Sequence, residues 1–168
     1  MGYTRGKKNT SIPVFQDLVD QDLKTGKFRP VYLLAGEDTL RIEGVVDKIR
    51  KDVLGITGSA FNFHVFQGDQ APVEKILQQA LSLPMLGDKQ VIWVKQVDRC
   101  LGTQDSQGHL EKYLGDPVPE TILILSGDKV DKRKKWVKTC LENGYFFDFT
   151  PPTGEALVQW VLKAAQRQ

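Results

Sequence analysis

The segment that most resembles a chemical site follows an apolar run at residues 30–35, where Gly36 precedes Glu37 and Asp38. A phosphate-binding loop has the pattern G-x-x-x-x-G-K-[ST], because backbone amides and a lysine must neutralise the phosphate charge. Here no second glycine, no lysine and no magnesium-holding Ser or Thr stands in the required place. We therefore expect no ATP binding, and we interpret the two carboxylates as groups that suit a helix N-terminus.

Other reactive residue types are few and scattered. His64 and His109 lie at no metal-ligand spacing, and Cys100 and Cys140 form no CxxC pair. Asp98 follows a predicted strand, where P-loop ATPases hold magnesium, but alone it is better interpreted as a turn residue. No G-x-S-x-G elbow occurs. The sequence therefore predicts no catalytic residue, metal site or cofactor, and two reduced thiols of a cytoplasmic protein.

The densest charge run comprises Lys129, Lys132, Arg133, Lys134, Lys135 and Lys138. Basic runs can contact a phosphate backbone. Aromatic interleaving is limited to Trp136, which we expect to face the core. We favour a solvated helix face, and we keep DNA contact by residues 132–135 as the alternative.

A second candidate surface is apolar. The segment 83–89 (LPMLGDK) begins with a Leu-Pro turn signal and closes with Gly-Asp, so Met85 and Leu86 are expected side by side in an exposed loop. Exposed apolar pairs often have no role. Methionine, however, is common at adaptable binding surfaces. Both interpretations stay open on the pattern alone.

The elements that must position these residues alternate between strand and helix. Apolar or aromatic runs at 30–35, 61–66, 91–97, 121–125 and 145–149 predict five strands. Helical spacing predicts helices over 13–24, from 37 to Gly55, after Pro72, around 110–114, from an Asp131 cap to Asn143, and around 157–164. The alternation predicts a three-layer α/β domain with a parallel sheet.

Length and charge set the wider frame. The 168 residues suit a mobile arm over 1–12, one α/β domain over 13–150 and, after Pro151-Pro152, the first helix of another domain over 151–168. A net charge of +2 indicates no particular partner. No targeting signal or bilayer-length apolar run occurs, so we expect a cytoplasmic protein with no membrane contact.

Several segments resemble, in order and spacing, the delta subunit family of the bacterial DNA polymerase III clamp loader. The resemblance covers about residues 28–165. It is carried by the runs PVYLLAGED at 30–38, LSLPMLGDKQVI at 81–92, TILIL at 121–125, DKRKK at 131–135 and LVQW at 157–160. The 81–92 run is similar to a family segment of small and apolar residues, proline, an apolar pair, a basic residue and a strand.

This resemblance implies an AAA+ α/β domain whose nucleotide site is degenerate. It implies that Met85 and Leu86, flanked by Leu83 and Pro84, enter a pocket on the beta sliding clamp, with Leu86 where phenylalanine is common. It further implies a non-catalytic polymerase subunit that helps to open the clamp, together with gamma/tau and delta prime subunits and DNA in the assembly. Family members continue through further domains, so we expect a fragment.

Three other hypotheses stay open. A divergent ATPase would bind ATP through the Gly36 loop. A nucleic-acid-binding module would bind DNA through residues 129–138 with a steep salt dependence. An inactive AAA+-like domain would serve a different partner.

Overall fold

The centre of the molecule is a five-stranded sheet in which every strand pairing is parallel. The structure, a computed structural model, describes residues 14–165. The strand order is β2-β3-β4-β1-β5. The strands are β1 (Val31–Ala35), β2 (Phe63–Gln67), β3 (Gln90–Lys95), β4 (Thr121–Gly127) and β5 (Phe146–Asp148). The predicted α/β class and its five parallel strands are confirmed.

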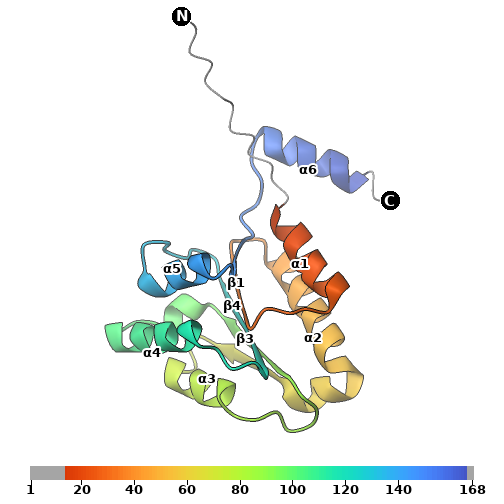
Figure 1. Ribbon diagram of the computed structural model, residues 1–168. Helices are drawn as coiled ribbons and strands as arrows, with labels where there is room; N and C mark the ends of the chain where they lie inside the picture. Colours follow the sequence, from red (N-terminus) through yellow and green to blue (C-terminus); the bar gives the residue numbers. More distant parts are fainter. Residues whose placement is uncertain (1–13, 166–168) are drawn as a thin grey trace, which may run out of the picture.

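Helices cover both faces of this sheet (Figure 1). On one face lie α1 (Val14–Thr25) and α2 (Thr39–Asn62), and on the other lie α3 (Val73–Ala80), α4 (Gln104–Gly115) and α5 (Lys135–Glu142). Successive strand residues point to opposite faces, so Leu33 packs with the α3–α5 layer and Tyr32 with the α1–α2 layer. The predicted three layers are therefore present.

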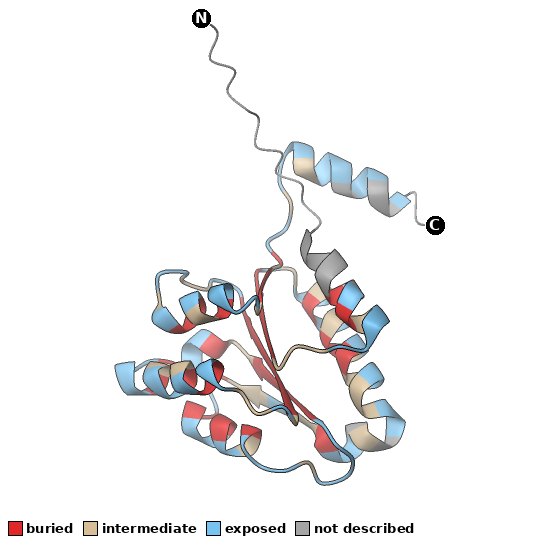
Figure 2. Cartoon of the chain, viewed as in Figure 1, coloured by how far each residue is buried: buried red, intermediate tan, exposed pale blue. Residues whose placement is uncertain are grey.

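Burial follows strand position within the sheet (Figure 2). Every residue of β1 and β4 is buried, because both strands have neighbours on two sides and helices on both faces. In β2, which forms one edge, most residues are partly buried, and Val65 is exposed. Such continuous apolar runs are typical of central parallel strands.

The second helix is longer than the sequence predicted. We expected it to end at Gly55 and a strand to start at Phe61. Gly55 does break the helical geometry (φ 63°, ψ −166°), but a further helical segment continues to Asn62. Pairing with β3 begins only at Phe63, opposite Val91. The strand start predicted at Phe61 is therefore wrong by two residues, because aromatic alternation does not distinguish a last helical turn from the start of a strand.

Two helix starts also differ from expectation. The helix predicted around 110–114 is α4, which begins earlier, at Gln104, because Thr103 and Ser106 form a reciprocal capping box. Asp131 does not cap α5, whose N-cap is Lys134. Its carboxylate instead accepts hydrogen bonds from the backbone N–H and guanidinium of Arg133.

Two helical elements remain. A 3-10 turn (Val97–Cys100) follows β3, and α6 (Glu155–Ala165) follows β5 and the two prolines. The predicted arm over 1–12 lies outside the described residues, and the boundary at 150 stays a prediction. Over residues 14–165 no helix is long and apolar enough to cross a membrane.

Candidate functional site

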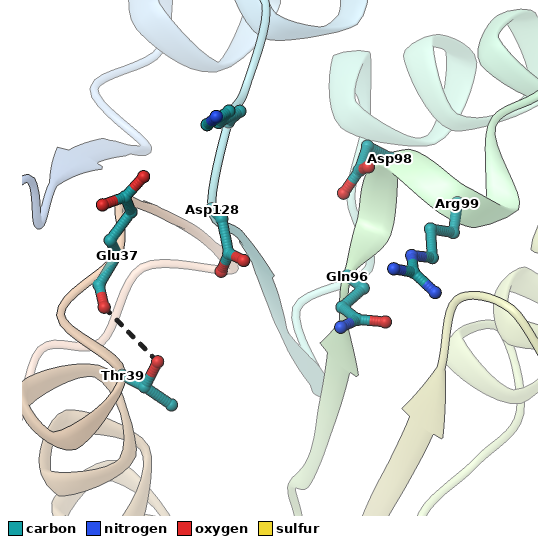
Figure 3. A pocket seen from close by; sticks show the side chains of 7 residues that line it. Glu37, Thr39, Gln96, Asp98, Arg99 and Asp128 are labelled. Atoms are coloured by element: carbon teal, nitrogen blue, oxygen red, sulfur yellow. Dashed lines mark hydrogen bonds between the residues drawn. The ribbon is translucent and has the colours of Figure 1, made fainter.

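The carboxyl ends of the strands surround an open hollow of about 520 Å³. The connections after β1, β3 and β4 line it with Glu37, Thr39, Gln96, Asp98, Arg99, Asp128 and Lys129 (Figure 3). Ligands of open α/β sheets bind at this edge, where the connections leave toward opposite faces. By position and size, this hollow is where a nucleotide would be expected.

The connection between β1 and α2 is only three residues long, and two of its backbone amides already have hydrogen-bond acceptors within this chain. The Gly36 N–H donates to Gly127 O at 3.0 Å, and the Asp38 N–H donates to Phe149 O at 3.2 Å. The Asp38 carboxylate accepts from the Arg41 N–H and so caps α2. Backbone amides that a phosphate-binding loop would turn toward phosphate are therefore engaged with neighbouring backbone.

The charge of the hollow opposes an anionic ligand as well. Three carboxylates, those of Glu37, Asp98 and Asp128, line it against the cations Arg99 and Lys129. Within residues 14–165, no group of three or more His, Cys, Asp or Glu side chains is arranged to hold a metal ion. Asp38 caps α2 and Asp98 lies in the 3-10 turn after β3, as the sequence predicted for these two residues, whereas Glu37 lines the hollow.

The apolar loop lies at the opposite, amino-terminal edge of the sheet, between α3 and β3 (Figure 1). Met85 is 77% exposed, Leu86 is 53% exposed and Leu83 is 82% exposed. Pro84, between them, is half-buried. The structure thus displays the predicted pair on the surface, with a third apolar side chain two residues away.

Two buried amide side chains fix the backbone of this loop. The Asn62 Oδ1 accepts a hydrogen bond from the Met85 N–H at 2.8 Å, and its Nδ2 donates to Leu86 O. The Gln90 Nε2 donates to Ser82 O at 2.7 Å. Sequence reasoning missed both residues. Asn62 was assigned to a strand, and no local pattern indicated that either side chain reaches the loop.

The basic run lies at the carboxyl-terminal edge, in the connection from β4 to α5 and in the start of α5. Of its cations, Lys132 Nζ lies 3.8 Å from Asp148 Oδ2, and Arg133 binds both oxygens of Asp131 at 3.0 Å. The paired guanidinium lowers the pKa of the exposed Asp131 carboxyl to about 2. Lys135 is exposed and Lys134 half-buried. Trp136 is buried in the core, as predicted.

The remaining candidate side chains have ordinary surroundings. His64 lies on edge strand β2, and burial lowers its pKa. His109 Nδ1 lies 3.1 Å from Glu74 Oε1 at the surface. Cys100 and Cys140 are free thiols, and burial raises their pKa values to about 11 and about 12. Such thiols are poor nucleophiles at neutral pH.

Comparison with known proteins decides the family. The family model described as "DNA polymerase III, delta subunit" matches residues 32–150, a range that contains the apolar loop and the hollow. The chain belongs to this delta subunit family. The DNA polymerase III subunit delta of Bacillus subtilis (strain 168) is 27% identical over 136 residues, which cover 76% of this chain and 39% of the relative.

Solved structures agree on the fold. The DNA clamp loader delta protein of Bacillus subtilis superposes with a TM-score of 0.77 at 24% identity, over 90% of this chain and 47% of that one. A mutant RuvB of Thermotoga maritima gives 0.53 at 16% identity, over 92% and 49%. The predicted AAA+-like domain is confirmed as a fold. The chain spans less than half the length of these delta relatives.

Proposed function

We propose that this chain is the part of a clamp-loader delta subunit that binds the beta sliding clamp. Met85 and Leu86 enter an apolar pocket of the clamp, and Leu83 and Pro84 flank the contact. The observation that carries the proposal is the exposure of this apolar pair on a loop whose backbone is held by Asn62. An exposed apolar anchor on a fixed backbone is typical of an interaction hot spot.

Clamp opening needs no ATP hydrolysis by this chain. A ligand shifts a conformational equilibrium by the difference between its affinities for the two states. A delta subunit that binds the clamp more tightly when the clamp interface is open therefore favours opening by binding alone. The amides of Gly36 and Asp38 support this passive role, since both already donate to backbone carbonyls of this chain.

We propose that the longer protein works in the assembly that the family resemblance implies. In the longer delta subunit, further domains join gamma/tau and delta prime subunits, which supply ATP hydrolysis, and the assembly acts on primed DNA in the cytoplasm. The present chain contributes the clamp contact. That contact and the basic run lie at opposite edges of one sheet, so they are separate surfaces of this chain.

The test is binding of this chain to the purified sliding clamp of the same organism, measured by calorimetry. Met85→Ser combined with Leu86→Ser should abolish or greatly weaken binding. Leu40→Ser is a matched control, because Leu40 is 83% exposed but lies at the start of α2, at the other edge of the sheet. Equal binding by the double variant and the unsubstituted chain would refute the proposal.

A further inference from the structure

Asn62 is a buried polar residue whose side-chain amide is hydrogen-bonded to the apolar loop. It is the last residue of α2 and is 1% exposed. Its Oδ1 accepts from the Met85 N–H at 2.8 Å, and its Nδ2 donates to Leu86 O, 24 residues along the chain. The two backbone groups that it binds belong to the same two residues whose side chains are displayed outward.

The chemistry of this contact requires an amide. A carboxamide offers an acceptor and a donor side by side, so it can pair with an N–H and a C=O as another peptide unit would. An aspartate at residue 62 would lack the donor, and an alanine would lack both groups. The Asn62 side chain thus makes the two backbone hydrogen bonds that a neighbouring strand would otherwise make to Met85 and Leu86. Both of their side chains stay exposed to solvent.

The loop is also held at its base. The Gln90 side chain, which is fully buried, donates to Ser82 O at 2.7 Å and to Gln79 O at 3.1 Å. Directly after Leu86, Gly87 turns the chain with a positive φ of 87°. The backbone from residue 82 to residue 86 is therefore bound at both ends, although Met85 and Leu86 remain exposed.

We propose that Asn62 is a positioning residue that holds the Met85–Leu86 pair in its binding geometry before any partner arrives. This inference rests on the proposed clamp contact for its consequence, but not for the loop geometry itself. A loop that is already ordered loses less conformational freedom when it binds. If only a fraction of loops had the competent geometry, the apparent affinity would fall by that same fraction.

The first test needs no partner. Amide hydrogen exchange of the chain, followed by NMR, should show the Met85 amide protected, because its N–H is bound to Asn62. In Asn62→Ala that protection should fall at least tenfold, while the amides of Ile92 and Leu123 in the central strands keep theirs. Exchange of the Met85 amide at the rate of a free peptide in the unsubstituted chain would overturn the inference, whatever the stability of the variant.

The second test measures clamp affinity by calorimetry with the same proteins. Loss of two backbone contacts and of loop order should weaken binding of Asn62→Ala by about 5- to 100-fold. Asn62→Asp keeps an acceptor for the Met85 N–H but sets a carboxylate oxygen against Leu86 O in a buried site, so it should weaken binding at least as much as Asn62→Ala. Unchanged affinity of Asn62→Ala despite a lost Met85 protection would refute the positioning role.

The two proposals fail in different ways. If the Met85→Ser and Leu86→Ser double variant binds the clamp normally, the clamp contact is wrong, and the exchange of the Met85 amide still decides whether Asn62 holds the loop. If the double variant fails to bind while Asn62→Ala binds normally, the clamp contact stands and the positioning role of Asn62 does not.

Discussion

Replacing Met85 and Leu86 together by serine is the perturbation whose effect follows most directly from the structure. Full burial of such a side chain contributes about 1.5–3 kcal/mol. Only the exposed part of each remains to be buried in a complex, and that part is 77% for Met85 and 53% for Leu86. Scaled in this way, the pair contributes about 2–4 kcal/mol, which is about a 30- to 700-fold loss of clamp affinity.

The same exposure predicts little change in the stability of the fold. Neither side chain belongs to the buried cores on the two faces of the sheet. Surface substitutions change the unfolding free energy by about 0.5 kcal/mol or less. The assay is calorimetry against the clamp, beside denaturant unfolding of each variant. A loss of less than about fivefold in a variant of normal stability would refute the calculation. So would an equal loss in Leu40→Ser.

Leu86→Phe provides a test in the opposite direction. The ring offers more apolar area to a pocket than leucine does, so we expect about two- to fivefold tighter clamp binding. The loop should tolerate the larger side chain, because Leu86 is half-exposed and its backbone is held through its carbonyl. Weaker binding at unchanged stability would mean that the pocket of this clamp is shaped for leucine.

Three further predictions concern the fold and the carboxyl-terminal edge of the sheet. Gly36→Ala should lower the unfolding free energy by about 2–4 kcal/mol, because at φ 147° the added Cβ would overlap the neighbouring backbone. Gly44→Ala is the control: its Cβ would lie in open space on α2, so it should be neutral or stabilising when both variants are unfolded by denaturant. Burial raises the pKa of the Cys140 thiol to about 12, so the folded protein keeps a proton that the unfolded chain loses. The contribution of Cys140 to the unfolding free energy should therefore be constant below about pH 8.5 and fall above it. Cys140→Ala should reduce the alkaline fall, and an identical pH profile would contradict the assignment. Lys134→Ala with Lys135→Ala should reduce the slope of log DNA affinity against log salt by about 1–2, measured by anisotropy, and an unchanged slope would exclude these lysines from DNA contact.

Much of the fold could be predicted from the sequence because its signals are local. Continuous apolar runs such as residues 121–125 indicate strands buried on both faces, and the helical stripes between them indicate covering layers. The absence of the lysine and second glycine after Gly36 is equally local, and our expectation of no ATP binding rests on it.

Errors arose where two local patterns compete. Phe61 and Asn62 match both the end of a helix and the start of an alternating strand, and only the register with β3 decides between them. Thr103 and Ser106 cap α4 inside a stretch whose composition is typical of a loop. Asp131 has the residue type of a cap, yet its carboxylate is satisfied by Arg133 two residues later.

The sequence by itself determined the family resemblance, the layers and the identity of the apolar pair, because these depend on residue type and on spacing along the chain. Only the tertiary structure decided how the pair is displayed. The hydrogen bonds from Asn62 to Met85 and Leu86 join residues more than twenty positions apart, and such contacts leave no periodic signal in one sequence. The physical reason is that hydrogen bonding is local in space, while a pattern in the sequence is local along the chain.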